Sequence, residues 1–251
     1  MIVKAGITAV LFLSLLWIKP AIAVGSSTFT EGNTKYQSGY FKGAIDFYES
    51  ILKSGKETAV LDYNLGNAYF RLGHKGKALA YYERALKILP RNEDIHWNID
   101  IVKSAVSDRI EPIDEGLTVT WIKKITDQLT INELAMILST VLILFTTMSF
   151  LAFVFPTLKP FIRGASVLVV FIFLAVTILF GFKWVEVKDP RVVIIDKEVE
   201  ARYGPSDKET RAFMLHEGAE AKVTDESKDW CYVTLENKSA GWIPKKACEV
   251  I

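Results

Sequence analysis

The stretch "YNLGNAYFRLGHKGKALAYYERALKILP", Tyr63 to Pro90, predicts a pair of packed helices. Glycine and alanine stand at fixed places in it, and small side chains let two helix backbones approach closely. We therefore expect Gly66 and Ala78 to face each other across the pair. Pro90 should end the second helix, because proline cannot continue the helical hydrogen-bond ladder.

The same pattern occurs 34 residues upstream, which is the period of tetratricopeptide repeats. The matching pairs are Gly32 and Gly66, Asn33 and Asn67, Gly39 and Gly73, Ala44 and Ala78, Tyr48 and Tyr82, and Leu52 and Leu86. The second copy resembles the tetratricopeptide family closely, through Leu65, Gly66, Tyr69, Gly73, Ala78, Tyr82, Ala85 and Pro90. The first copy is degenerate, with Glu31, Ile51 and Lys56 where the family has Leu, Ala and Pro.

A further helix is predicted over residues 92–109, with Asn92 as its N-cap and apolar residues at helical spacing. We expect it to close the exposed end of the stack, because two repeats alone leave an apolar face uncovered. The repeat domain would then cover residues 25–109.

The family resemblance implies a concave face, lined by the first helix of each pair, that holds an extended peptide or a helix of a partner protein. That face would carry Phe29, Asn33, Tyr36, Gln37, Tyr63, Asn67, Phe70 and Arg71. The asparagines could hydrogen-bond a peptide backbone, or they could bridge neighbouring helices, and the sequence leaves both readings open. The carboxylate-clamp version of the family has a lysine at the position of Phe29, so recognition of a partner's C-terminus is not expected.

Residues 1–23 predict a signal peptide: Lys4, an apolar run and the small-x-small pattern Ala21-Ile22-Ala23. An uncleaved anchor is the alternative, and both imply export.

Two charge-free apolar runs predict transmembrane helices over residues 134–155 and 164–183, because about 20 residues span the hydrocarbon core. The link 156–163 carries Lys159 and Arg163, which favour the cytoplasmic side, and two prolines that interrupt the helix. The repeats and the C-terminal segment would then lie outside the cytoplasm. The alternative is a pair of buried helices in a soluble domain.

The linker 110–133 contains "VTWIKKITDQL", which places Trp121, Ile122, Ile125 and Leu129 on one helical face and Lys123, Lys124 and Asp127 on the other. Such a helix suits either the membrane surface or a docking place on the repeat stack. Thr130 and Glu133 predict a capping box that starts the first span.

Residues 190–251 consist of short alternating runs such as "RVVIID", "CYVTL" and "GWIP", which predict a small β-barrel. They resemble a bacterial SH3-like domain through Val199–Arg202, Gly204–Ser206, Leu215–Gly218, Asp229-Trp230 and Gly241–Pro244. The resemblance implies a shallow groove lined by Tyr203, Trp230, Trp242 and Pro244. Its rings could stack on a proline-rich or peptidoglycan-type peptide, or the tryptophans could merely cover the barrel rim.

Cys231 and Cys248 both lie in this segment, which the expected topology places where disulfides persist. The sequence leaves open whether they form a bridge or whether Cys248 is a free thiol buried in the core.

The sequence contains no motif for catalysis or for binding a metal or cofactor. The charge is nearly balanced, which gives no reason to expect nucleic acid as a partner. His74, His96 and His216 lie in different predicted elements, and neither they nor the cysteines have ligand spacing, so no metal site is expected. "GHKGKA" lacks the spacing of a phosphate loop. We expect no cofactor and no enzymatic activity.

The fold class is therefore multidomain: all-α tetratricopeptide repeats, a transmembrane helical hairpin and a small all-β SH3-like barrel. In this order of parts the whole chain resembles the BatE-like proteins of the aerotolerance-operon family. The resemblance implies a scaffold in the bacterial inner membrane, with its repeats and barrel on the periplasmic side. Its implied partners are von Willebrand factor A-type membrane proteins and a MoxR-type ATPase. Two other hypotheses stay open: a cell-wall sensor that binds peptidoglycan peptides, and an accessory subunit of a wall-processing enzyme.

Overall fold

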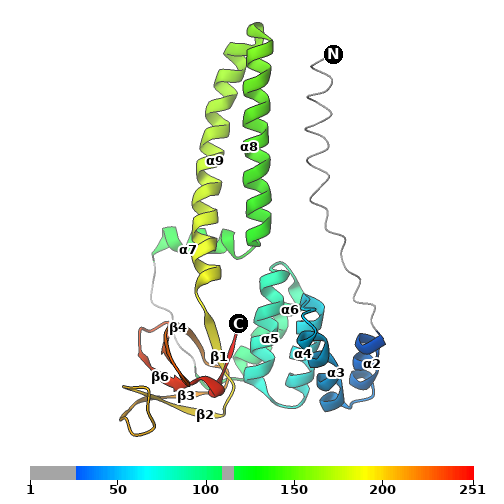
Figure 1. Ribbon diagram of the computed structural model, residues 1–251, viewed down its shortest axis with the longest axis vertical. Coiled ribbons are helices and arrows are strands. Elements are labelled where there is room, and N and C mark those ends of the chain that lie inside the picture. Colours follow the sequence, from blue (N-terminus) through cyan, green and yellow to red (C-terminus); the bar gives the residue numbers. More distant parts are fainter. Residues whose placement is uncertain (1–26, 109–115) are drawn as a thin grey trace.

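The computed structural model describes residues 27–108 and 116–251. The expected signal peptide, residues 1–23, lies outside these ranges, as does part of the linker. Helical repeats form the N-terminal part, an apolar hairpin projects from the molecule, and a β-domain follows at the C-terminus (Figure 1). The expected fold class is confirmed.

The repeat helices are α2 (Ser27–Gln37), α3 (Phe41–Lys53), α4 (Ala59–Arg71), α5 (Lys75–Ile88) and α6 (Glu93–Ser104). They pack in succession, α2 on α3, α3 on α4, α4 on α5 and α5 on α6. The side chain of Asn92 accepts a hydrogen bond from the backbone N–H of Ile95, which confirms the expected N-cap of α6. Gly39 and Gly73 have φ values of +79° and +81°, so each turn needs a residue without a Cβ.

Gly66 lies against the ring of Tyr82. A Cβ built at Gly66 would lie 2.5 Å from a ring carbon of that tyrosine. Gly32 and Tyr48 repeat this contact in the first unit. The glycines therefore make room for a buried tyrosine ring in each pair.

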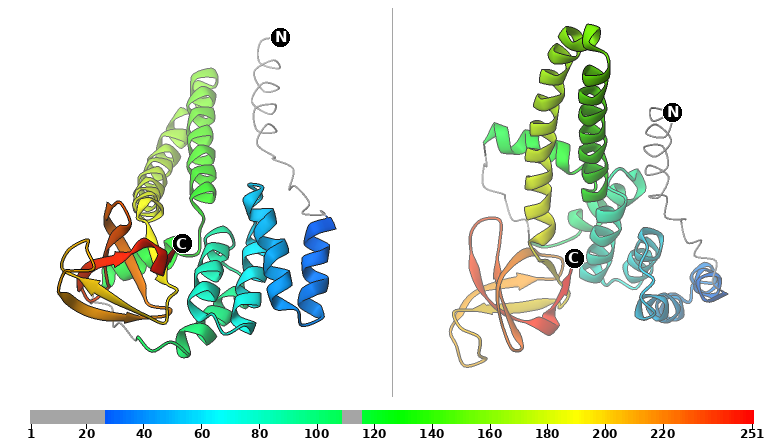
Figure 2. Two further views of the ribbon diagram at one scale, coloured as in Figure 1. Left: turned by 60° about the horizontal axis from the view of Figure 1, so that its bottom comes forward. Right: turned by 45° about the horizontal axis from the view of Figure 1, so that its top comes forward.

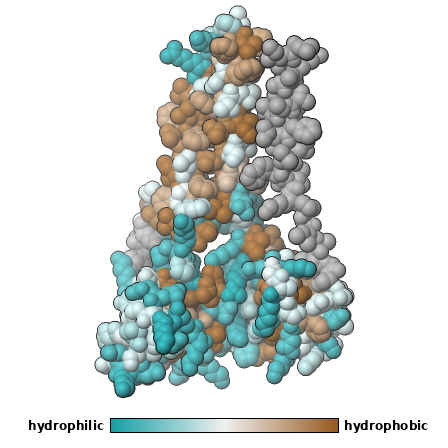
Figure 3. All heavy atoms as spheres, in the orientation of Figure 1, coloured by the Kyte–Doolittle hydropathy of each residue, from teal (hydrophilic) through white to brown (hydrophobic). Residues whose placement is uncertain are grey.

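The hairpin consists of α8 (Ile131–Val154), the short helix η2 (Pro156–Leu158) and α9 (Lys159–Lys188). The spans Ile131–Val154 and Pro156–Lys188 are long and apolar enough to cross a membrane, and their side chains are mostly exposed. Figure 3 shows apolar side chains along the hairpin and mainly polar ones over the domains beneath it.

α8 begins where the sequence predicts, whereas α9 begins earlier than predicted. The capping box of Thr130 and Glu133 is present and confirms the expected start of α8. α9 begins at Lys159, inside the segment expected to be a loop, and Pro160 lies in its first turn. Proline is tolerated there because the N–H groups of a first turn have no helical partner.

The C-terminal domain is one antiparallel sheet of 7 strands in the order β3-β2-β6-β5-β4-β1-β7. The strands are β1 (Arg191–Ile194), β2 (Glu198–Arg202), β3 (Arg211–His216), β4 (Glu220–Ser227), β5 (Trp230–Thr234), β6 (Ala240–Pro244) and β7 (Cys248–Val250). Alternate residues point into the core, where Ile194, Leu215 and Ile243 are fully buried.

The β-domain packs against the repeats, and the two lie next to each other in Figure 2. Strands β1 and β7 contact α5, and Val193 and Ile251 join the apolar core of the repeats. Gly76 donates its backbone N–H to Glu217 at 2.9 Å, and a Cβ at Gly76 would collide with the carbonyl oxygen of Ile194. α6 packs on α5 with Ile95, Ile99 and Val102 buried, as expected for a helix that closes the stack, and the β-domain covers another side of α5.

Charged groups frame this contact. Lys103 lies between the carboxylates of Glu83, at 3.0 Å, and Glu220, at 2.6 Å. Burial raises the pKa of Glu83. Burial alone would lower the pKa of Lys103, but the two carboxylates outweigh it and hold that pKa above its usual value. Asp108 accepts hydrogen bonds from the backbone N–H of His216 at 2.8 Å and from its ring Nδ1 at 2.7 Å.

Candidate partner-binding faces

Asparagines form a repeating ladder across the first helices of the repeats. The Oδ1 atom of Asn33 accepts from the hydroxyl of Tyr48 at 2.7 Å and from Nδ2 of Asn64 at 3.2 Å. Thirty-four residues on, Asn67 Oδ1 accepts from Tyr82 at 2.7 Å and from Nδ2 of Asn98 at 3.3 Å. The bridging reading is thus what the structure shows for the two oxygens.

The amide nitrogens of the same asparagines are different. Among the described residues, neither Asn33 Nδ2 nor Asn67 Nδ2 has a hydrogen-bond partner, and both residues are half-exposed. Each amide is held in place by its oxygen and keeps two N–H donors for a ligand. The hypothesis of peptide binding therefore concerns only the nitrogen of each side chain.

An aromatic ladder runs beside the asparagines at the same period, at Phe29, Tyr63 and Trp97. Tyr48 and Tyr82, from the second helices, lie beside the first two rings, with ring centroids 5.9 Å apart in each pair. In the described part of the chain, no helix after α6 supplies such a tyrosine. Trp97 is accordingly 67% exposed.

The remaining predicted groove residues lie toward the helix ends. Tyr36 packs edge-on against Phe41, with ring centroids 5.2 Å apart, and the guanidinium of Arg71 lies 4.6 Å from the centroid of the same Phe41 ring. Phe70 packs partly against the core, and Gln37 is exposed. These side chains border the asparagine and aromatic ladders.

The outer surface of the β-domain carries an aromatic face. Cross-strand pairing places Trp230 opposite Pro244 and Tyr232 opposite Trp242. The rings of Tyr232 and Trp242 are in tilted contact, with centroids 5.2 Å apart. Residues 230, 232, 242 and 244 are all half-exposed, while Cys231 and Ile243, which alternate with them, are buried. This face lies on β5 and β6, whereas the repeats contact β1 and β7, so the repeats leave it open.

Tyr203 does not join this face in the structure. It lies in the loop after β2, where its backbone N–H bonds to the carbonyl of Thr210, and it is 72% exposed. Its ring makes no aromatic contact with another described residue. Arg202, which pairs with Trp242 across the strands, borders the face instead.

The two cysteines are free thiols that lie side by side. Their Sγ atoms are 3.7 Å apart, with Cys231 buried in β5 and Cys248 half-exposed at the start of β7. A hydrogen bond from Cys248 lowers the pKa of Cys231, and the same contact raises the pKa of Cys248.

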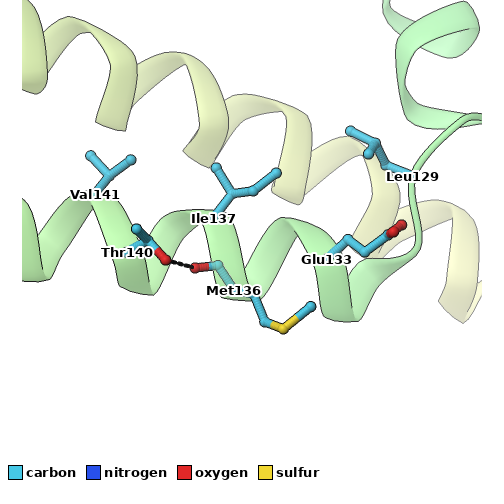
Figure 4. A pocket seen from close by; sticks show the side chains of 6 residues that line it. All are labelled: Leu129, Glu133, Met136, Ile137, Thr140 and Val141. Carbon is cyan, nitrogen blue, oxygen red and sulfur yellow. Dashed lines mark hydrogen bonds between the residues drawn. The ribbon is translucent and has the colours of Figure 1, made fainter. Parts of the chain in front are cut away.

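A shallow hollow lies on the side of the hairpin. It has a volume of about 400 Å³ and is lined by Leu129, Glu133, Met136, Ile137, Thr140 and Val141 (Figure 4). Glu133 is already bonded to Arg91 and Thr130, and the Thr140 hydroxyl bonds to the carbonyl of Met136. The hollow is therefore an apolar surface without free polar groups. Within the described residues, no group of three or more His, Cys, Asp or Glu side chains is arranged to hold a metal ion.

Comparison with known families agrees with this division. Residues 63–92 match the tetratricopeptide repeat family, and residues 196–248 match the bacterial SH3 domain family. Members of both families are typically interaction modules rather than enzymes. No curated protein matches the chain. The two domains support a role in protein–protein interaction or in peptidoglycan binding, and the two apolar helices suggest membrane anchoring.

Sequence reasoning missed part of both faces. Trp97 and Asn98 stand 34 residues after Tyr63 and Asn64, so extending the repeat period into α6 would have found them. Tyr232 stands two residues after Trp230 and therefore on the same side of β5, so strand alternation would have found it.

Proposed function

We propose that this protein is a non-enzymatic, membrane-anchored scaffold that holds an extended segment of a partner protein on the α2–α4–α6 face. The observation that carries the proposal is the double ladder: an asparagine amide held by its oxygen with its nitrogen free, beside a ring, repeated at the same period. Free N–H donors in a row suit the carbonyl groups of an extended backbone. The neighbouring rings suit apolar side chains of that segment.

The order of parts supports a more specific context. In its sequence of repeats, apolar hairpin and SH3-like domain the chain resembles BatE-like proteins of the aerotolerance-operon family. On that resemblance we propose a place in the bacterial inner membrane, with both domains on the periplasmic side. The partners would be von Willebrand factor A-type membrane proteins that work with a MoxR-type ATPase in stress tolerance.

The first test variant keeps the hydrogen bonds of the asparagine ladder. Asn67→Asp retains an oxygen to accept from Tyr82 and Asn98 but replaces the free N–H₂ by an acceptor. Trp97→Ala removes an exposed ring that makes no ring contact with another described side chain. Asn237→Asp, at an exposed position in the turn between β5 and β6, is the matched control.

Each variant is expressed in cells, photo-crosslinked and purified from detergent-solubilised membranes. We expect Asn67→Asp and Trp97→Ala to lower recovery of a crosslinked von Willebrand factor A-type protein about tenfold, since a lost hydrogen bond or ring contact in a groove costs about 1–2 kcal/mol. The control should recover as much as wild type. Unchanged recovery with both groove variants would remove the support for this face.

A second candidate function rests on the aromatic face of the β-domain. Trp230, Tyr232 and Trp242 with Pro244 form an open stacking surface, which suits the peptide part of peptidoglycan. Binding of the full protein to purified cell-wall sacculi would then fall with Trp242→Ala and not with Trp97→Ala. The opposite pattern, or no binding, argues against a wall-sensing role.

A further inference from the structure

Helix α7 (Leu117–Thr126) carries an apolar stripe that no other part of the described chain covers. Leu117, Trp121 and Ile125 follow one another at every fourth position and are 82%, 63% and 46% exposed. Residues four apart share one side of a helix. The opposite side includes Thr126, which is buried, and α7 packs against α9. The stripe therefore lies on a different side of α7 from the one that packs against the protein.

The position of α7 is set by the hairpin. The helix lies across the end of the hairpin that is nearest the domains, as Figure 1 shows. Four residues separate it from α8. Lys124 Nζ lies 5.6 Å from the centroid of the Trp121 ring, and near the end of α9 Lys188 Nζ lies 4.8 Å from that of Trp184. Exposed tryptophans with nearby lysines are typical of the boundary between hydrocarbon and water.

The repeat domain contacts the same end of the hairpin. Arg91, in the turn between α5 and α6, bonds to the Glu133 carboxylate at 2.5 Å and to the carbonyl of Gln128 at 2.7 Å. This pair ties the turn to the first turn of α8. Ile88 and Leu89, which end α5, are both exposed there.

We propose that α7 lies in the headgroup boundary of the bilayer that α8 and α9 cross, with Leu117, Trp121 and Ile125 toward the acyl chains of phospholipids. The turn at Ile88 and Leu89 lies at the same boundary, so the repeats and the β-domain are held close to the lipid surface. The stripe lies on a helix that packs against α9, beside two helices long and apolar enough to cross a membrane, and this position identifies lipid as the occupant. The inference rests on the proposed membrane anchoring.

The experiment places a fluorescent unnatural amino acid at one position at a time in the full-length protein, reconstituted into phospholipid vesicles. The positions are Trp121, Leu144 within α8, and Tyr203, which is exposed in the β-domain. Nitroxide-labelled lipids then quench the probe from a shallow or a deep position in the bilayer. We expect shallow quenching at position 121 to be at least about threefold stronger than at position 203, with position 144 quenched best from the deep label.

The outcomes separate the two claims. If position 144 is quenched and position 121 behaves like position 203, the hairpin crosses the bilayer but α7 does not touch it, and the inference is wrong. If position 144 is not quenched, the anchoring itself fails and the inference falls with it. A second variant adds Leu117→Glu and Ile125→Glu, both at exposed positions, and should reduce quenching at 121 toward the value at 203. Undiminished quenching would contradict the assigned orientation of the stripe.

Discussion

Asp62, in the first turn of α4, holds both carboxylate oxygens in the protein interior without a hydrogen-bond partner among the described residues. Burial raises the pKa of Asp62 to about 7, with a smaller contribution from Glu57. An unfolded chain would release this proton near pH 4. The folded state therefore retains a proton over a range of pH in which the unfolded state has lost it.

The sign of the pH dependence follows. Below about pH 4 both states hold the proton, and as the pH rises toward 7 the free energy of unfolding should fall by up to about 4 kcal/mol through this group. Asp62→Asn removes the titration. We expect the difference in unfolding free energy between variant and wild type to rise in favour of the variant from pH 4 to pH 8, measured by denaturant unfolding in detergent. Asp46→Asn, at an exposed position on α3, is the control, and a parallel profile for Asp62→Asn would contradict the assignment.

The Sγ atoms of Cys231 and Cys248 lie 3.7 Å apart, and a disulfide needs about 2 Å. Small side-chain rotations would therefore let the two sulfurs bond. Exposure to oxidised glutathione should convert the pair into an intramolecular disulfide, with release of reduced glutathione. Mass spectrometry should show the loss of two hydrogens and no thiol left to alkylate in the unfolded protein. Cys248→Ser should instead leave Cys231 unbridged. Two alkylatable thiols after full oxidation would contradict this pairing.

At the level of elements, each helix pair is built around a glycine under a tyrosine ring. Gly66→Ala should destabilise the protein by about 1–3 kcal/mol, because the buried ring of Tyr82 cannot move aside. Gly43→Ala is the matched control: it also meets a ring, but that ring belongs to the exposed Tyr40 and can rotate away. The control should be neutral or stabilising, since alanine favours helix over glycine. Denaturant midpoints of the two variants test this, and equal losses would show that ring burial does not decide the cost.

At the scale of the whole molecule, the repeats and the β-domain are joined by a contact that includes the C-terminal strand. Arg84 on α5 bonds to the Glu249 carboxylate at 2.6 Å and, through Nε, to the carbonyl of Val250 at 2.8 Å. Arg84→Ala should raise amide hydrogen exchange of β7 about tenfold, since hydrogen bonds to a charged group contribute about 1.5–3 kcal/mol. Arg202→Ala breaks a similar ion pair to Glu200 on the far side of the domain and should leave β7 unchanged. Equal exchange in both variants would mean that the contact does not hold the strand.

The part of the molecule that could be predicted from sequence is the part that depends on local pattern. The 34-residue identities predict the repeat helices, the capping residues Asn92 and Thr130 predict where α6 and α8 begin, and the charge-free runs predict the hairpin. These signals are written in spacing and in side-chain chemistry along the chain. Helix starts are local because the capping side chain bonds to a backbone only three residues away.

The candidate faces were predicted in part. Asn33, Asn67, Trp230 and Trp242 were singled out by repeat position or by resemblance. Their partners were not, because a hydrogen bond such as Asn98 to Asn67 depends on how far one helix is rotated over the next. Tyr203 was expected on the aromatic face through resemblance, yet it lies in the loop after Arg202 and makes no ring contact with another described residue.

By itself the sequence determined the identity and order of the three parts, since helical period, strand alternation and apolar length are properties of neighbouring residues. Only the tertiary structure decided that the β-domain covers α5, that Gly66 makes room for Tyr82, and that α7 leaves a stripe uncovered. The physical reason is that burial is a relation between surfaces. Val193 lies in β1 and Ile251 follows β7, and both are apolar. Only the packing of the two domains places these side chains in the core of the repeats rather than in the core of the β-domain.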